Sequence, residues 1–146
     1  MSGNWVARKL IEDPEYYAKT LARHHEITNN DPWKFASRKY SRQMSAAKNS
    51  RGLAWRLDRD KTIKMIVETK TCALSGRPIT HQIGCPSGAS IDRKDSRLGY
   101  TKRNIQIVTR EVNSAKMAMS DAEFIQLCVD VAVYNGYIKN EPNTTS

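Results

Sequence analysis

The sequence has no apolar run long enough to span a bilayer, and its first residues, MSGNWVARKL, lack the apolar core of a signal peptide. These absences predict a soluble, cytoplasmic protein without a membrane partner. Acidic residues are also scarce: 15 Asp and Glu stand against 24 Lys and Arg, which gives a formal charge of +9. Such a surplus favours a polyanionic partner, and nucleic acid is the expected one.

Cysteine is equally sparse. The chain has three cysteines, an odd number, and none of them forms a CxxC pair. A disulfide framework is therefore not expected in a protein without a signal peptide. Cys72, His81 and Cys85 are close enough in sequence to supply three zinc ligands, but no fourth ligand lies nearby. A structural zinc site is therefore not expected either.

The N-terminal region, residues 1–70, is predicted to be helical and basic. Asp13-Pro14 and Asp31-Pro32 each predict a helix start, because Asp caps a helix N-terminus and Pro suits the first helical position. The first helix should end near Asn30 and the second at Gly52, a residue typical of helix C-termini. Basic side chains between residues 38 and 64 greatly outnumber acidic ones, so we expect this region to be an arm that contacts DNA.

Shorter elements should follow. The alternating polarity of residues 53–57 predicts a strand, and Asp58 is placed to cap the next helix. Gly and Pro break up residues 71–88, where we expect a small hairpin around CALSGRPIT. The remaining predicted elements are strands at 89–92 and 104–109, a long basic loop between them, and a helix over 110–119.

The last helix has the strongest start. The sequence SDAE, Ser120 to Glu123, is a capping box, and five apolar side chains then share one helical face. That face should pack on the core, and the acidic opposite face should point away from DNA. Residues 137–146 are expected to form a flexible tail. The five apolar residues are Phe124, Leu127, Cys128, Val131 and Ala132.

The order of strand, basic loop, strand and helix has a chemical consequence. It can bring the carboxylate of Asp92, at the end of the first strand, close to the amide of Asn113 on the helix. Carboxylate and amide oxygens suit Mg²⁺ when phosphate and water complete its shell. An ion held there would polarise a phosphodiester, while the surrounding Arg and Lys hold the polyanion. We therefore expect Mg²⁺, or Mn²⁺, as the cofactor.

Four motifs in this part of the chain also carry a family resemblance. They are CALSG at 72–76, DRKDSRLGY at 92–100, NIQIV at 104–108 and NSAK at 113–116. In this order the motifs resemble the HNH, or ββα-metal (His-Me finger), endonuclease family, in the form found in phage proteins and some restriction enzymes. The resemblance spans residues 72–130. It implies a small α+β protein with a ββα-metal nuclease core and C-terminal helix over 71–136.

The resemblance implies roles for individual residues. Asp92 and Asn113 would hold the metal, and Asn104 would belong to the site. Arg93 stands where the family usually has its catalytic His; arginine cannot accept a proton from water, so it would contact phosphate instead. The general base is expected to be His81, the nearest imidazole, and Tyr100, the distant His24-His25 pair and bulk solvent are alternatives.

Each of these residues also has an ordinary structural interpretation. Asp92 alone would be read as half of a surface ion pair, and Asn113 as a helix N-cap. Asn104 is expected to tie the long loop by hydrogen bonds. His81 alone would be an ordinary hydrogen-bonded histidine. The motifs taken together favour the catalytic interpretation for Asp92.

The sequence therefore predicts a metal-dependent DNA endonuclease, a phosphodiester hydrolase that nicks as a monomer or cuts both strands as a homodimer. Two alternatives stay open. Because Arg93 replaces the usual catalytic His, the protein could be a non-catalytic DNA-binding module of HNH fold. The basic surface would also suit a phage-encoded inhibitor of a host enzyme. The residues expected to contact DNA are Arg42, Lys48, Arg51, Arg56, Lys94, Arg97, Lys102, Arg103, Arg110 and Lys116.

Overall fold

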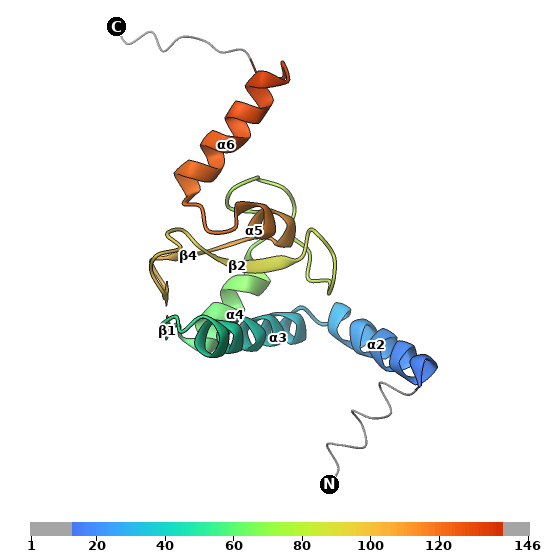
Figure 1. The fold of residues 1–146 in the computed structure, drawn as a ribbon. Helices are drawn as coiled ribbons and strands as arrows, with labels where there is room; N and C mark the ends of the chain where they lie inside the picture. Colours follow the sequence, from blue (N-terminus) through green and yellow to red (C-terminus); the bar gives the residue numbers. More distant parts are fainter. Residues whose placement is uncertain (1–12, 139–146) are drawn as a thin grey trace, which may run out of the picture.

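The structure, a computed structural model, describes residues 13–138 and shows a mixed α+β fold (Figure 1). The N-terminal segment that was examined for a signal peptide, and most of the tail expected over 137–146, lie outside the described residues. Within residues 13–138, no helix combines the length and the apolar character that crossing a bilayer requires.

Two helices begin where the Asp-Pro pairs predict them. Asp13 and Asp31 each accept a hydrogen bond at 3.0 Å from a main-chain N–H of the first turn. The predicted stop at Gly52 is also confirmed: the chain leaves the helical region there with φ +60°, a conformation that favours glycine. The elements are α2 (Pro14–Asn29), α3 (Pro32–Ser45) and a π-helical segment that extends α3, η1 (Ala46–Ser50).

The two predicted strands around the basic loop pair with each other. They run antiparallel, with Ile91 opposite Ile107 and Asp92 opposite Gln106. The predicted strand at 53–57 shrinks to two residues, which pair in parallel with a two-residue strand inside the loop. The strands are β1 (Trp55–Arg56), β2 (Ala89–Arg93), β3 (Tyr100–Thr101) and β4 (Ile105–Thr109).

Helices cover both faces of the β2–β4 pair. α5 (Arg110–Lys116) packs on one side of it, and α3 together with α4 (Arg59–Glu68) packs on the other (Figure 1). α4 starts where predicted, because the side chain of Asp58 accepts a hydrogen bond from the third residue of the helix at 2.8 Å. α5 ends earlier than predicted, since Met117 takes up a left-handed φ of +51° and breaks the helical path.

One apolar core joins the helical N-terminal region to the strands. Phe35 and Ala36 of α3 and Ile66 of α4 cluster with Ile91 of β2 and Val108 of β4, all of them buried. The expected hairpin around CALSGRPIT appears as a tight reversal, in which the N–H of Cys72 donates a hydrogen bond to the carbonyl of Arg77 at 2.8 Å. Parts of the chain on either side of residue 70 are thus packed into one unit.

The last helix, α6 (Asp121–Tyr134), begins with the predicted capping box but does not pack as predicted. Leu127 is 47 % exposed and Val131 is 56 % exposed, and of the five apolar residues only Phe124 packs against the core. The helix projects from the rest of the fold (Figure 1). Helical periodicity identifies which side chains share a face, but not whether another element covers that face.

Candidate functional site

The ends of β2 and α5 bring the two predicted metal ligands to one place. Asp92 lies near the end of β2, and Asn113 lies in the middle of α5, which packs across β2. Both residues line the same small polar cavity, about 170 Å³ in volume. The sequence prediction that the strand–loop–strand–helix order would bring these two residues together is therefore confirmed.

Asp92 is buried, and it is not a surface ion pair. Its Oδ2 accepts hydrogen bonds from Lys116 Nζ at 2.7 Å and from Gln106 Nε2 at 2.9 Å. Lys116 is fully buried, and its ammonium also contacts Asp121 Oδ1 at 2.8 Å and the carbonyl of Arg93 at 2.7 Å. A buried charge without partners would be very unfavourable, so this network explains how both ions are tolerated.

Lys116 was predicted to contact DNA, and that prediction is wrong. Its side chain is 0 % exposed, so it cannot reach a phosphate. Burial by itself would lower the pKa of Lys116, but hydrogen bonds and charges from Asp121 and Asp92 outweigh burial and raise that pKa above its ordinary value. The ammonium is thus held in its charged form, and the two carboxylates around it leave one negative charge in excess.

Two oxygens in this region have no partner among the described residues. The hydrogen bonds of Asp92 engage Oδ2 and leave Oδ1 unused. Asn113 uses its Nδ2 to donate to Ser90 Oγ at 2.7 Å and to the carbonyl of Ile91 at 3.5 Å, which leaves Asn113 Oδ1 unused. Asn113 is not the helix cap, because Thr109 fills that position.

The donor set fits a divalent ion in composition. One carboxylate side chain and one amide side chain line a polar cavity, and hard oxygen ligands of this kind suit Mg²⁺ or Mn²⁺. The site would be lean in protein ligands, since the described residues contain no group of three or more His, Cys, Asp and Glu placed to hold a metal.

Cationic and aromatic side chains form another part of the cavity wall. Arg93 donates to the carbonyls of Ser96 at 2.7 Å and Leu98 at 2.9 Å, and its guanidinium lies 5.2 Å from the ring centroid of Tyr100. Arg51 donates to the Tyr100 hydroxyl at 3.2 Å. Both arginines line the cavity, so an anion that enters it meets two guanidinium groups.

Asn104 ties the basic loop, as predicted. Its Oδ1 accepts from the Asp95 N–H at 3.0 Å, and its Nδ2 donates to the carbonyls of Asp95 at 3.0 Å and Gly99 at 2.9 Å. The side chain is buried and does not line the cavity. It therefore supports the loop that carries Arg93's hydrogen-bond acceptors and does not face a substrate.

The imidazole that was favoured as general base lies elsewhere. His81 hydrogen-bonds the carbonyl of Ile66 at 2.9 Å, packs edge-on against Phe35, and is not among the residues that line the cavity. The side chains of His24 and His25, on α2, are outside the described ones. Tyr100 is the one alternative base that does line the cavity, and its hydroxyl accepts from Arg51.

The remaining predicted DNA contacts lie on the surface. Nine of the ten residues are exposed, Lys116 being the exception. Arg97 is held in an ion pair with Asp95 at 2.9 Å, so it is only partly available to a phosphate. Arg42 and Arg110 line a second hollow, next to the first.

Sequence reasoning missed several residues of the site. Gln43 of α3 lines the cavity and bonds both the N–H and the carbonyl of Ile91 at 2.9 Å. Nothing in the local sequence indicated that contact. Gln106 could have been recognised, because it is a polar residue within the apolar run Ile105–Val108. Asp121 was identified only as part of a helix cap.

In comparisons with known proteins, the chain matches no family model, and no curated protein or solved structure is detectably similar to it.

Proposed function

We propose that this protein is a metal-dependent DNA endonuclease with an HNH-type ββα-metal core formed by β2, β4 and α5. The observation that carries the proposal is the cavity itself: Asp92 and Asn113 both line it together with Arg93 and Arg51, and each has a side-chain oxygen without a partner among the described residues. The ordered motifs in residues 72–116 support it independently. Such an enzyme would act inside the cell, on DNA.

The residues divide the chemistry between them. Asp92 and Asn113 would hold Mg²⁺ or Mn²⁺, which when bound supplies positive charge to the scissile phosphate and to the leaving oxygen. Arg93 and Arg51 would orient the phosphate through charge-assisted hydrogen bonds. A water would attack phosphorus while the bond to the leaving oxygen breaks. The proton of the water would pass to bulk solvent, and the leaving oxygen would take up a proton from solvent, because no imidazole lines the described cavity.

The buried network would support this arrangement without touching the substrate. Lys116 and Gln106 hold Oδ2 of Asp92, which leaves Oδ1 free for a metal ion. Asn113 is oriented in the same way by Ser90. One cavity cuts one strand, so a monomer would nick, and a double-strand break would need a homodimer or two successive events.

Supercoiled plasmid provides the test. The purified protein should convert it to open circle with Mg²⁺ or Mn²⁺ and not with EDTA. Asn113→Ala and Asp92→Asn should each lower the rate at least tenfold, roughly the smallest loss typical of residues around a metal. Asn113→Asp should keep partial activity. Asp92→Asn is preferable to Asp92→Ala, because alanine would leave Lys116 short of a partner and could unfold the site.

The control is Asp60→Asn, which removes an acid that is 94 % exposed on α4 and should leave cleavage unchanged. Thermal melts of every variant exclude loss of fold. Wild-type activity in Asp92→Asn and Asn113→Ala would contradict the assignment of the metal ligands.

A second function is favoured by two observations. Asp92 is already neutralised by Lys116, and no imidazole lines the described cavity. A non-catalytic DNA-binding module would show both features. It would bind DNA with the same salt dependence but leave the plasmid intact with every metal, so the cleavage assay separates the two functions.

A further inference from the structure

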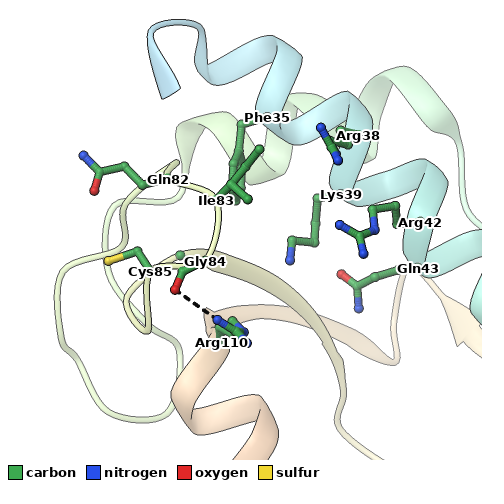
Figure 2. A pocket seen from close by; sticks show the side chains of 11 residues that line it. Phe35, Arg38, Lys39, Arg42, Gln43, Gln82, Ile83, Gly84, Cys85 and Arg110 are labelled. Atoms are coloured by element: carbon green, nitrogen blue, oxygen red, sulfur yellow. Dashed lines mark hydrogen bonds between the residues drawn. The ribbon is translucent and has the colours of Figure 1, made fainter. Parts of the chain in front are cut away.

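A second hollow, of about 340 Å³, lies between α3, the segment 82–88 and the first residue of α5 (Figure 2). Arg38, Lys39 and Arg42 line it from α3, and Arg110 lines it from the opposite side. In Figure 2, Lys39 extends from α3 toward the side where Arg110 lies. Four cations thus converge on one space from two elements that are far apart in sequence.

No acid balances these charges. None of the residues that line the hollow is Asp or Glu, and none of the four cations forms a salt bridge with a described residue. Arg110 Nη1 donates a hydrogen bond to the carbonyl of Gly84 at 3.1 Å. Within the described part of the chain, Arg38 Nη1 is the one buried side-chain nitrogen or oxygen without a hydrogen-bond partner.

The cations disturb one another. The pKa of Arg38 is lowered, first by burial and then by the charge of Arg42. The pKa of Lys39 is lowered by burial and by the charges of Arg42 and Arg110. Both shifts mean that this environment destabilises the charged forms of Arg38 and Lys39, and a bound anion would stabilise them again. Buried, unpaired donors are otherwise rare in folded proteins.

We propose that this hollow binds a phosphate group of the nucleic-acid strand, next to the phosphate that occupies the Asp92 cavity. The inference rests on the proposed function, because it takes the strand at the first cavity as its neighbour. Gln43 lines both spaces, so the two sites share a wall. Guanidinium forks match the oxygens of phosphate in pairs, and three arginines with one lysine offer more charge than a carboxylate would need.

The phosphate has two possible sources, an internal diester or a strand terminus. Binding is measured by fluorescence anisotropy in EDTA, with one 20-base-pair duplex made with and without 5′-phosphates, over a series of KCl concentrations. Lys39→Gln/Arg42→Gln should weaken binding at least tenfold at 0.1 M salt and reduce the slope of log K against log salt by about 0.9 for one lost phosphate contact.

A matched control removes the same charge elsewhere. Lys70→Gln/Arg77→Gln changes two exposed cations that do not line the hollow, so it should keep the wild-type slope. Lys39→Arg/Arg42→Lys keeps the charge and should retain most of the binding, which separates a phosphate site from a packing defect. If 5′-phosphates strengthen wild-type binding and the Gln variant loses that gain, the ligand is a strand terminus. If both duplexes bind the wild type equally and lose the same affinity in the Gln variant, the ligand is an internal phosphodiester.

Equal affinity and slope for the wild type and Lys39→Gln/Arg42→Gln would overturn the proposal. The assay needs no cleavage, so it is independent of the metal site. Failure of the nuclease function would instead appear as an uncut plasmid, while DNA binding still depends on Lys39 and Arg42 in the hollow. Failure of the phosphate site would appear as unchanged binding together with metal-dependent cleavage.

Discussion

The ammonium of Lys116 lies 2.7 Å from Oδ2 of Asp92, and both side chains are buried. The pair joins the C-terminal end of α5 to β2, and Asp121 extends it to the start of α6. Its geometry decides how Asp92 can act. One carboxylate oxygen is engaged in the buried network, and the other has no partner among the described residues.

Removal of the ammonium should be costly. Lys116→Met would leave Asp92 and Asp121 close together without a counter-charge, and breaking a buried pair typically costs about 3–5 kcal/mol. The free energy of unfolding in urea measures the loss. Lys64→Met is the control, because the Lys64–Glu68 pair spans 3.8 Å on the surface and should be worth less than about 1 kcal/mol. Equal losses in the two variants would contradict a structural role for the buried pair.

The stability that this pair contributes should be lost at alkaline pH. The pKa of Lys116 is raised above its ordinary value of 10.5 by Asp121 and Asp92, which outweigh burial. A raised pKa contributes stability that is fully present below the unfolded value and is lost as pH rises through the folded one. The difference in unfolding free energy between the wild type and Lys116→Met should therefore be constant from pH 7 to about 10 and shrink above that range. A constant difference up to pH 11.5 would show that the ammonium does not carry the effect.

Gln43 should stabilise β2. Its side-chain amide bonds the N–H and the carbonyl of Ile91, both at 2.9 Å, in the way that a neighbouring strand would. Gln43→Ala leaves both main-chain groups unpaired and should cost about 1–3 kcal/mol. Hydrogen exchange at the Ile91 amide should accelerate in the variant. Gln126→Ala, on the exposed surface of α6, is the control, and unchanged exchange at Ile91 would refute the bridging role.

Asn104 should control the order of the basic loop. Asn104→Asp keeps an acceptor for the Asp95 N–H but loses the donor to the carbonyls of Asp95 and Gly99, and it sets a negative charge against them. Amides over 95–100 should exchange faster, while those of the β2–β4 pair stay protected. Asn49→Asp, an exposed change in η1, supplies the comparison. Faster exchange throughout the domain would mean that Asn104 supports the whole core instead of the loop.

Much of this fold can be predicted from short stretches of sequence. The Asp-Pro pairs, the capping box at Ser120 and the glycine at position 52 act through main-chain groups within a few residues, so they could be recognised directly. The order of β2, basic loop, β4 and α5 follows from local hydrophobic patterns in the same way. That order was enough to predict that Asp92 and Asn113 would meet, and that Asn104 would tie the loop between the strands.

What the sequence could not reveal depends on contacts between distant segments. Gln43 reaches Ile91 across 48 positions, and nothing near either residue encodes that contact. Lys116 reads as one more surface cation until packing buries it beside Asp92, and His81 reads as a candidate base until its ring is placed against Phe35. α6 carries an apolar face that only tertiary structure shows to be largely exposed. By itself, then, the sequence determined where the helices start, the two longer strands and the residues available to the site, because these depend on local main-chain geometry. Burial and charge pairing were decided by tertiary packing, because they depend on which surfaces the folded chain brings together.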